Sequence, residues 1–76
     1  MAGIVPIPHK QLEKVALAAG CRFVRQRGDH RVYWRNDLKR PVIIPTYKAV
    51  PVFIIKNNLR LLNLSTEEYL RILQAL

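Results

Sequence analysis

The sequence predicts an α+β protein: one helix, a three-stranded antiparallel sheet, and one or two C-terminal helices packed on one sheet face. Apolar residues recur at helical spacing over residues 9–19 and again after residue 51, and the strand-forming residues Val, Ile, Phe, Tyr and Trp are concentrated in the segments between them. With 76 residues, half of them hydrophobic and 24% charged, the chain has enough apolar material for one small core. No repeat or Gly/Ser-rich linker interrupts it. We expect a single domain over residues 1–76 with a loose start at residues 1–6.

The first helix is predicted over residues 9–19. Leu12, Val15, Ala16 and Ala19 follow the i, i+3, i+4, i+7 rule, with polar residues between them. Gly20 comes directly after the last periodic residue, where a left-handed helix end favours glycine. The segment is therefore an amphipathic helix with a defined end.

The middle of the chain predicts a hairpin followed by a third strand. Residues 21–27 and 30–35 are rich in Val, Phe, Tyr and Trp, and the step between them contains Gly28 and Asp29. Residues 41–45, with a proline at each end, form a short third strand. Because side chains alternate along a strand, one set of residues 30–35 shares one face and the other set the opposite face. The two sets are His30, Val32 and Trp34, and Arg31, Tyr33 and Arg35.

Two helices are predicted at the C-terminal end. Pro51 is suited to the first turn of one of them, where its missing N–H costs nothing. The residues that follow at helical spacing are Val52, Ile55, Leu59 and Leu62. The run from Ser65 to Glu68 matches the S-x-x-E capping box and begins the last helix, which has Tyr69, Leu70 and Leu73 as its apolar stripe.

The charge of the chain favours an acidic or phosphate-bearing partner. Thirteen Lys and Arg against five Asp and Glu give a formal charge of +8. More than half of the basic residues lie between positions 22 and 40, with Tyr33 and Trp34 among them. Aromatic and cationic side chains together bind single-stranded nucleic acid by stacking and phosphate contact. The alternative is a solvated basic face with Trp34 in the core.

Few residues are suited to catalysis. His30 is the one side chain in the basic run that can exchange a proton near neutral pH, although a histidine without a task is the commoner case. Cys21 cannot form an internal disulfide and is better suited to a buried apolar role. We expect no metal site and no small-molecule cofactor, since no Cys/His cluster has ligand spacing. The apolar runs are too short for a membrane span, which favours a cytoplasmic protein.

The segment from Arg27 to Tyr33, preceded by a helix that ends in Gly20, resembles the HicA toxins. The likeness extends from Lys10-Gln11-Leu12 through residues 40–45 to Asn58-Leu59-Arg60 and the Ser65–Tyr69 segment. It implies a fold like that of a double-stranded RNA-binding domain. It also implies an endoribonuclease (mRNA interferase) of a type II toxin-antitoxin system that cleaves mRNA and is held inactive by a HicB antitoxin.

Carried over residue by residue, the resemblance places the essential histidine of the family at His30 and the turn glycine at Gly28. Many members resemble Gly-Ser-His-His at this point, whereas this chain has Asp29 and Arg31 in place of the Ser and the second His. Gly28 and Asp29 are expected to support the site. The residues expected to contact RNA are Arg25, Arg27, Arg31, Tyr33 and Lys48.

A ribonuclease that needs no metal uses the 2′-OH of its substrate as nucleophile. The protein must supply a base, positive charge for the phosphorane and a proton for the leaving oxygen. His30 suits the first task, and Arg27 or Lys48 the second. Solvent, Tyr33 or His30 after proton uptake are the candidates for the third.

Three other interpretations of the sequence remain open. One is a non-catalytic RNA-binding module of the same fold, in which His30 is incidental. Another is a DNA-binding helix-turn-helix around Asn63, which Glu67 and Glu68 disfavour because they would approach phosphates. The last is a protein-interaction domain whose acidic partner covers the basic surface.

Overall fold

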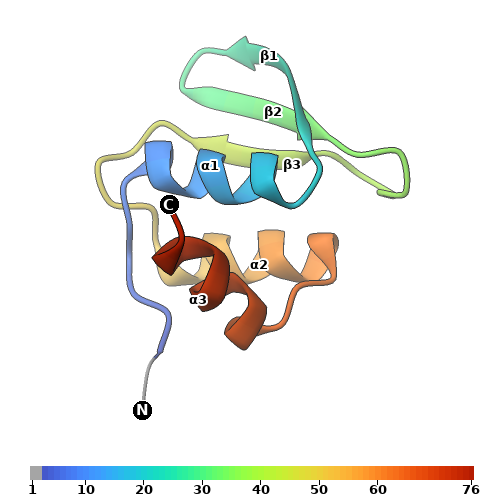
Figure 1. Ribbon diagram of the computed structural model, residues 1–76. Coiled ribbons are helices and arrows are strands. Elements are labelled where there is room, and N and C mark those ends of the chain that lie inside the picture. The colour runs from blue at the N-terminus through green and yellow to red at the C-terminus, as the bar shows by residue number, and fades with distance from the viewer. Residues whose placement is uncertain (1–2) are drawn as a thin grey trace.

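The computed structural model describes residues 3–76 and has the predicted order of elements (Figure 1). The elements are α1 (His9–Ala18), β1 (Arg22–Arg27), β2 (His30–Trp34), β3 (Val42–Pro45), α2 (Val52–Leu62) and α3 (Thr66–Gln74). The strands form one antiparallel sheet in the order β1-β2-β3. The α+β prediction is confirmed, both C-terminal helices are present, and the arrangement is consistent with a fold like that of double-stranded RNA-binding domains.

The N-terminal segment, for which the sequence predicts a loose start over residues 1–6, is only partly loose. Residues 1–2 lie outside the described part of the chain, and residues 3–6 form neither helix nor strand. Ile4 is nevertheless partly buried against the hydrophobic core. The segment therefore lacks regular structure but is attached to the rest of the protein.

Local sequence signals determine the helix ends. Gly20 has a φ of +97°, and the N–H groups of Gly20 and Cys21 donate to Leu17 and Ala16, which is the hydrogen-bond pattern of a Schellman motif. This motif ends α1 at Ala18, one residue earlier than predicted. Ser65 caps α3 and forms the predicted capping box with Glu68.

One detail of the helix prediction was wrong. Pro51 is the N-cap of α2 and not its first helical residue, because its ψ of 150° is extended. Its carbonyl accepts hydrogen bonds from the N–H groups of Ile54 and Ile55. Pro51 therefore caps the first turn of α2 without being part of the helix.

The core lies between the three helices and one face of the sheet. Tyr33, Val42 and Ile44 are fully buried there, whereas Ile43, between the last two on the opposite face, is 40% exposed. The helices contribute the remaining large buried side chains, among them Leu12, Val15, Ile55, Leu59, Leu62 and Tyr69. Alternation along β3 thus separates a core face from an open face.

Arg35 connects the helices at one end of the fold. Its guanidinium donates to the carbonyls of Ala19, after α1, and Leu62, at the end of α2, at 2.7 and 3.0 Å. Two further contacts to Asp37, at 2.6 and 3.0 Å, lower the pKa of that carboxyl. This arginine of the basic run therefore has a structural role.

Candidate active site

The β1–β2 turn holds His30 at the tip of a hairpin. Gly28 has a φ of +59° and Asp29 a negative φ, as in a type II′ turn with glycine at its first central position. The Gln26 side chain donates to the Gly28 carbonyl at 2.9 Å, and Thr46 N–H donates to the Asp29 carbonyl at 2.8 Å. The turn is thus anchored to both β1 and the end of β3, which limits the positions that His30 can take.

The imidazole of His30 is oriented by its neighbour in the chain. His30 Nδ1 lies 2.8 Å from Asp29 Oδ1, and the two side chains are 52% and 59% exposed. A carboxylate only accepts hydrogen bonds, so this contact requires the proton on Nδ1. In the neutral ring, Nε2 then has a free lone pair that can accept a proton from a substrate. The exposure leaves it accessible to a polynucleotide.

Three arginines share the face of the sheet that carries His30. The register places Arg22 opposite Trp34, Arg25 opposite Val32 and Arg27 opposite His30. Directly opposed residues of an antiparallel pair project to the same side. We call Arg22, Arg25 and Arg27 the arginine row. Val32 projects to the same face. Its side chain is only 8% exposed, although it does not belong to the hydrophobic core cluster on the other side of the sheet.

A β-bulge makes the arginine row possible. The register shifts between Phe23 and Arg25, so that Val24 has no partner on β2. Strict alternation would place Arg22 and Arg25 on opposite faces. Because Val24 is an extra residue in β1, the side chain of Arg25 projects to the same face of the sheet as that of Arg22, and the three arginines form a row on this face.

A cleft joins His30 to the free edge of β3 and to α2. We call it the His30 cleft, and it is lined by His30, Ile43, Pro45, Tyr47, Ile54, Asn57 and Asn58. Asn58 is 5% exposed and donates to the Ile43 carbonyl at 3.2 Å, which connects α2 to the strand edge. The sequence analysis did not assign Tyr47, Asn57 or Asn58 to the site. The signal for Asn58 was its position in the apolar stripe of α2, three residues after Ile55 and four before Leu62.

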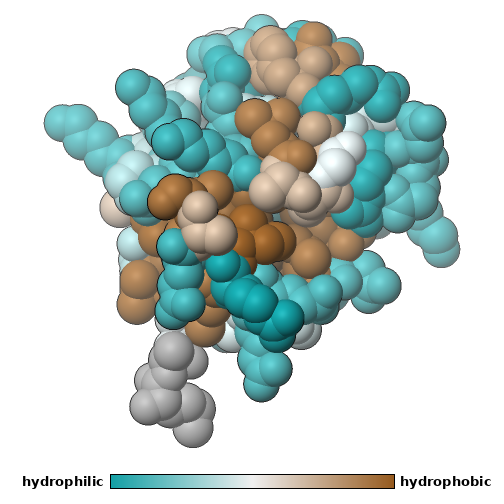
Figure 2. Space-filling view, viewed as in Figure 1, coloured by the Kyte–Doolittle hydropathy of each residue, from teal (hydrophilic) through white to brown (hydrophobic). Residues whose placement is uncertain are grey.

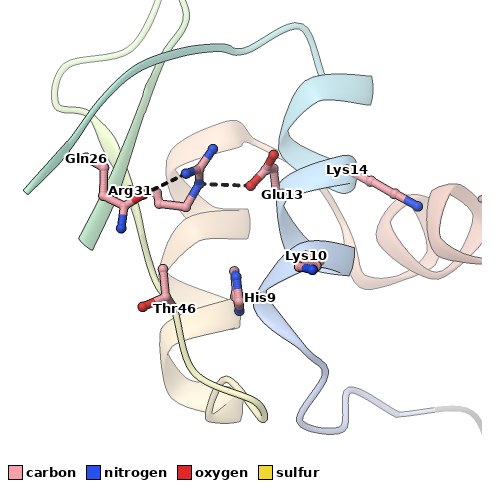
Figure 3. A pocket seen from close by; sticks show the side chains of 7 residues that line it. All are labelled: His9, Lys10, Glu13, Lys14, Gln26, Arg31 and Thr46. Atoms are coloured by element: carbon pink, nitrogen blue, oxygen red, sulfur yellow. Dashed lines mark hydrogen bonds and ion pairs between the residues drawn. The ribbon is translucent and has the colours of Figure 1, made fainter. Parts of the chain in front are cut away.

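Arg31 and Tyr33 lie on the other side of the sheet, as alternation predicted. Arg31 is held between elements: its Nε lies 2.9 Å from Glu13 of α1, and its terminal nitrogen donates to Gln26 at 2.7 Å (Figure 3). The same Nε contacts the Tyr33 hydroxyl at 3.1 Å, and the guanidinium lies 4.3 Å from the centre of the Phe23 ring. Arg31 therefore braces α1 against the hairpin.

The prediction that Tyr33 contacts RNA was wrong. Its side chain is fully buried, so its ring cannot stack on a base. Burial raises the pKa of its hydroxyl to about 12, and the hydrogen bond to Glu13 acts in the same direction. Tyr33 is therefore also excluded as the proton donor at the site, because it is a weak acid on the wrong face.

Two other residues singled out from the sequence, Lys48 and Cys21, do not line the His30 cleft. Lys48 is exposed in the loop between β3 and α2 and does not line the His30 cleft. Cys21 is buried, and burial raises the pKa of its thiol, which makes it a poor nucleophile.

Among residues 3–76, no three His, Cys, Asp or Glu side chains are grouped as metal ligands would be. In the same residues, every helix is too short or too polar to span a bilayer.

Fold and site together define a small basic α+β protein of the double-stranded-RNA-binding-domain-like class, with an exposed histidine at a hairpin tip. A family model described as the HicA toxin of bacterial toxin-antitoxin matches residues 9–64, well over half of the 76-residue chain. The chain therefore belongs to the HicA toxin family. Membership makes it the toxin of a toxin-antitoxin pair and implies an antitoxin partner. Comparisons with curated proteins and with solved structures give no match.

Proposed function

We propose that this toxin is an endoribonuclease that cleaves single-stranded mRNA without a metal, and that His30 is its general base. The observation that supports this most is the oriented, half-exposed imidazole: Nδ1 is held 2.8 Å from Asp29, and the ring lies opposite Arg27 on β1. A base needs an accessible lone pair of defined direction, and a phosphodiester needs cations nearby. This corner of the sheet offers both.

The reaction follows from these groups. Nε2 of neutral His30 takes the proton of a ribose 2′-OH, and the 2′-oxygen attacks the adjacent phosphorus. The P–O5′ bond breaks as the new P–O2′ bond forms, which yields a 2′,3′-cyclic phosphate and a 5′-OH. Arg27, which pairs with His30, stabilises the added negative charge in the transition state, and the rest of the arginine row binds phosphates further along the strand of RNA. Lys48, which is exposed next to Tyr47 in the loop after β3, is the other candidate for stabilising this charge.

The proton for the leaving oxygen has a candidate that the sequence analysis did not weigh. The side chain of Tyr47 is 42% exposed and lines the same cleft as His30. Of the residues that line this cleft, these two are the ones with titratable side chains. We assign the donor role to the Tyr47 hydroxyl or to a water molecule beside it.

The antitoxin partner is proposed to be a HicB-like protein that covers this face in the cytoplasm. Ile43 and Tyr47 line the cleft, and Phe53 of α2 is 66% exposed. Figure 2 shows that apolar groups also lie between hydrophilic side chains on the side of the molecule seen in Figure 1. Acidic groups over the arginine row and apolar groups over the cleft would exclude RNA by occlusion. No small-molecule cofactor is needed for either step.

Induced expression in bacteria tests the proposal. We expect wild type to arrest growth with decay of cellular transcripts, and His30→Ala to do neither. His9→Asn is the matched control, because it removes the other histidine and keeps a donor for the Tyr47 carbonyl, which His9 Nδ1 contacts at 3.1 Å. If wild-type protein binds RNA and leaves it intact, the protein is the non-catalytic RNA-binding module instead. Equal cleavage by wild type and His30→Ala would remove His30 from the mechanism.

A further inference from the structure

A second hollow lies at the other end of α2, away from His30. We call it the basic groove, and it is lined by Lys39, Arg40, Asn57, Arg60 and Leu61. Asn57 also lines the His30 cleft. Because one exposed side chain borders both hollows, they lie side by side along α2, and we refer to the two together as the depression. The depression therefore has the candidate active site at one end and three cations at the other.

The three cations of the basic groove are unpaired. None of the three ion pairs found among residues 3–76 involves Lys39, Arg40 or Arg60. The acidic residue nearest in the chain to Lys39 and Arg40, Asp37, is occupied by two contacts from Arg35. No carboxylate lines the groove. A concave surface lined by charge of a single sign concentrates counterions, so this groove attracts an anion.

The two ends of the depression are too far apart for one phosphate. His30 lies opposite Pro45 of β3, five residues from Arg40, a separation of at most about 17 Å along the chain. Along α2, Ile54 in the cleft is six residues from Arg60 in the groove, a rise of about 9 Å. A ligand that reaches both ends must be a chain with phosphates at intervals.

We infer that the basic groove is a second phosphate subsite for the same RNA strand, and that it binds the backbone a few nucleotides from the bond that is cleaved. This inference rests on the proposed ribonuclease function. Single-stranded RNA follows the depression past Asn57, and Lys39, Arg40 and Arg60 hold the distant phosphate. The subsite contacts no reacting atom, so it acts on binding and not on chemistry. It therefore makes the toxin prefer long single strands over short oligonucleotides.

The test compares two double variants on two lengths of RNA. Lys39→Gln with Arg60→Gln removes two groove cations, and Lys14→Gln with Arg71→Gln removes two exposed cations from α1 and α3 as a charge-matched control. The substrates are mixed-sequence RNAs of about 12 and about 3 nucleotides, lengths that span and do not span a usual single-strand site. Binding is measured by fluorescence anisotropy with 2′-O-methyl versions, which cannot be cleaved.

The expected result is a length-dependent change in KM. On the long RNA, the groove variant raises KM about tenfold with kcat unchanged, because a uniform binding contact is lost. The slope of log affinity against log salt falls by about 0.7 for each phosphate contact removed. On the short RNA, the groove variant and wild type behave alike, and the control pair shows no such dependence on length.

Several outcomes would overturn the inference. They are an equal loss on both RNA lengths, an equal effect of the control pair, no effect at all, or a loss confined to binding of the antitoxin. The last would assign the groove to the protein partner. If wild-type protein bound RNA without cleaving it, the ribonuclease proposal would fail separately, and anisotropy on the two lengths would still decide the groove.

Discussion

Replacing Asp29 with asparagine separates the orientation of His30 from its chemistry. The Asp29–His30 contact is short, at 2.8 Å, but both side chains are more than half exposed. Exposed pairs of this kind are worth about 0.2–1 kcal/mol, so the orienting effect on kcat is at most about fivefold. The buried aspartate of a serine protease triad, in contrast, is worth about 10⁴. Loss of the base itself, in His30→Ala, costs about 10² to 10⁴.

The same substitution should lower KM. Exchanging the carboxylate for a neutral amide removes a negative charge beside the path of a polyanion, so RNA binds more tightly. Asp29→Asn is thus expected to lower kcat and KM together. Single-turnover cleavage of a labelled RNA gives the rate, and its concentration dependence gives the affinity. A loss in kcat as large as that of His30→Ala, or a rise in KM, would refute this account of Asp29.

Two further predictions concern the open face and the core. If about five phosphates are contacted, a fourfold rise in salt weakens RNA binding about a hundredfold. Arg25→Gln is expected to reduce the slope of log affinity against log salt by about 0.7, because one phosphate contact is lost. An unchanged slope would remove Arg25 from the binding face. Because folding raises the pKa of Tyr33 from 10.0 to about 12, the folded state binds more protons than the unfolded chain in this range. The contribution of Tyr33 to the free energy of unfolding should therefore fall by about 1 kcal/mol per pH unit between about pH 10 and about pH 12. Urea denaturation over this range measures the decline, and Tyr33→Phe should make it shallower by this amount. An equally steep decline in Tyr33→Phe would contradict the assignment.

Much of the fold could be predicted because its signals are local. Gly20 ends α1, Gly28 shapes the hairpin turn, and the Ser65–Glu68 box begins α3, each through backbone geometry or hydrogen bonds within a few residues. Alternation also placed His30 and Arg31 on opposite faces of β2. The start of α2 could not be predicted to the residue, because whether Pro51 or Val52 is the first helical residue depends on the ψ angle of Pro51 alone.

The site was only partly predictable because its parts are brought together over long sequence separations. Tyr47 and Asn57 meet His30 only when α2 packs against the edge of β3, and the Asn58 hydrogen bond to Ile43 belongs to that packing. The burial of Tyr33 likewise depends on α1 and was not apparent from a basic run of sequence. A count of nearby cations and aromatics does not distinguish the two faces of a strand.

The amino-acid sequence by itself determined the order of elements, the turn at Gly28 and the presence of one histidine among many cations, since each depends on neighbours in the chain. The tertiary structure alone decided which cations share the histidine's face. The bulge at Val24 shifts the register of β1 by one residue and thereby brings Arg22 to the same side as Arg25. A shift of one residue reverses the facing of every side chain beyond it, and only the pairing of two strands can specify it.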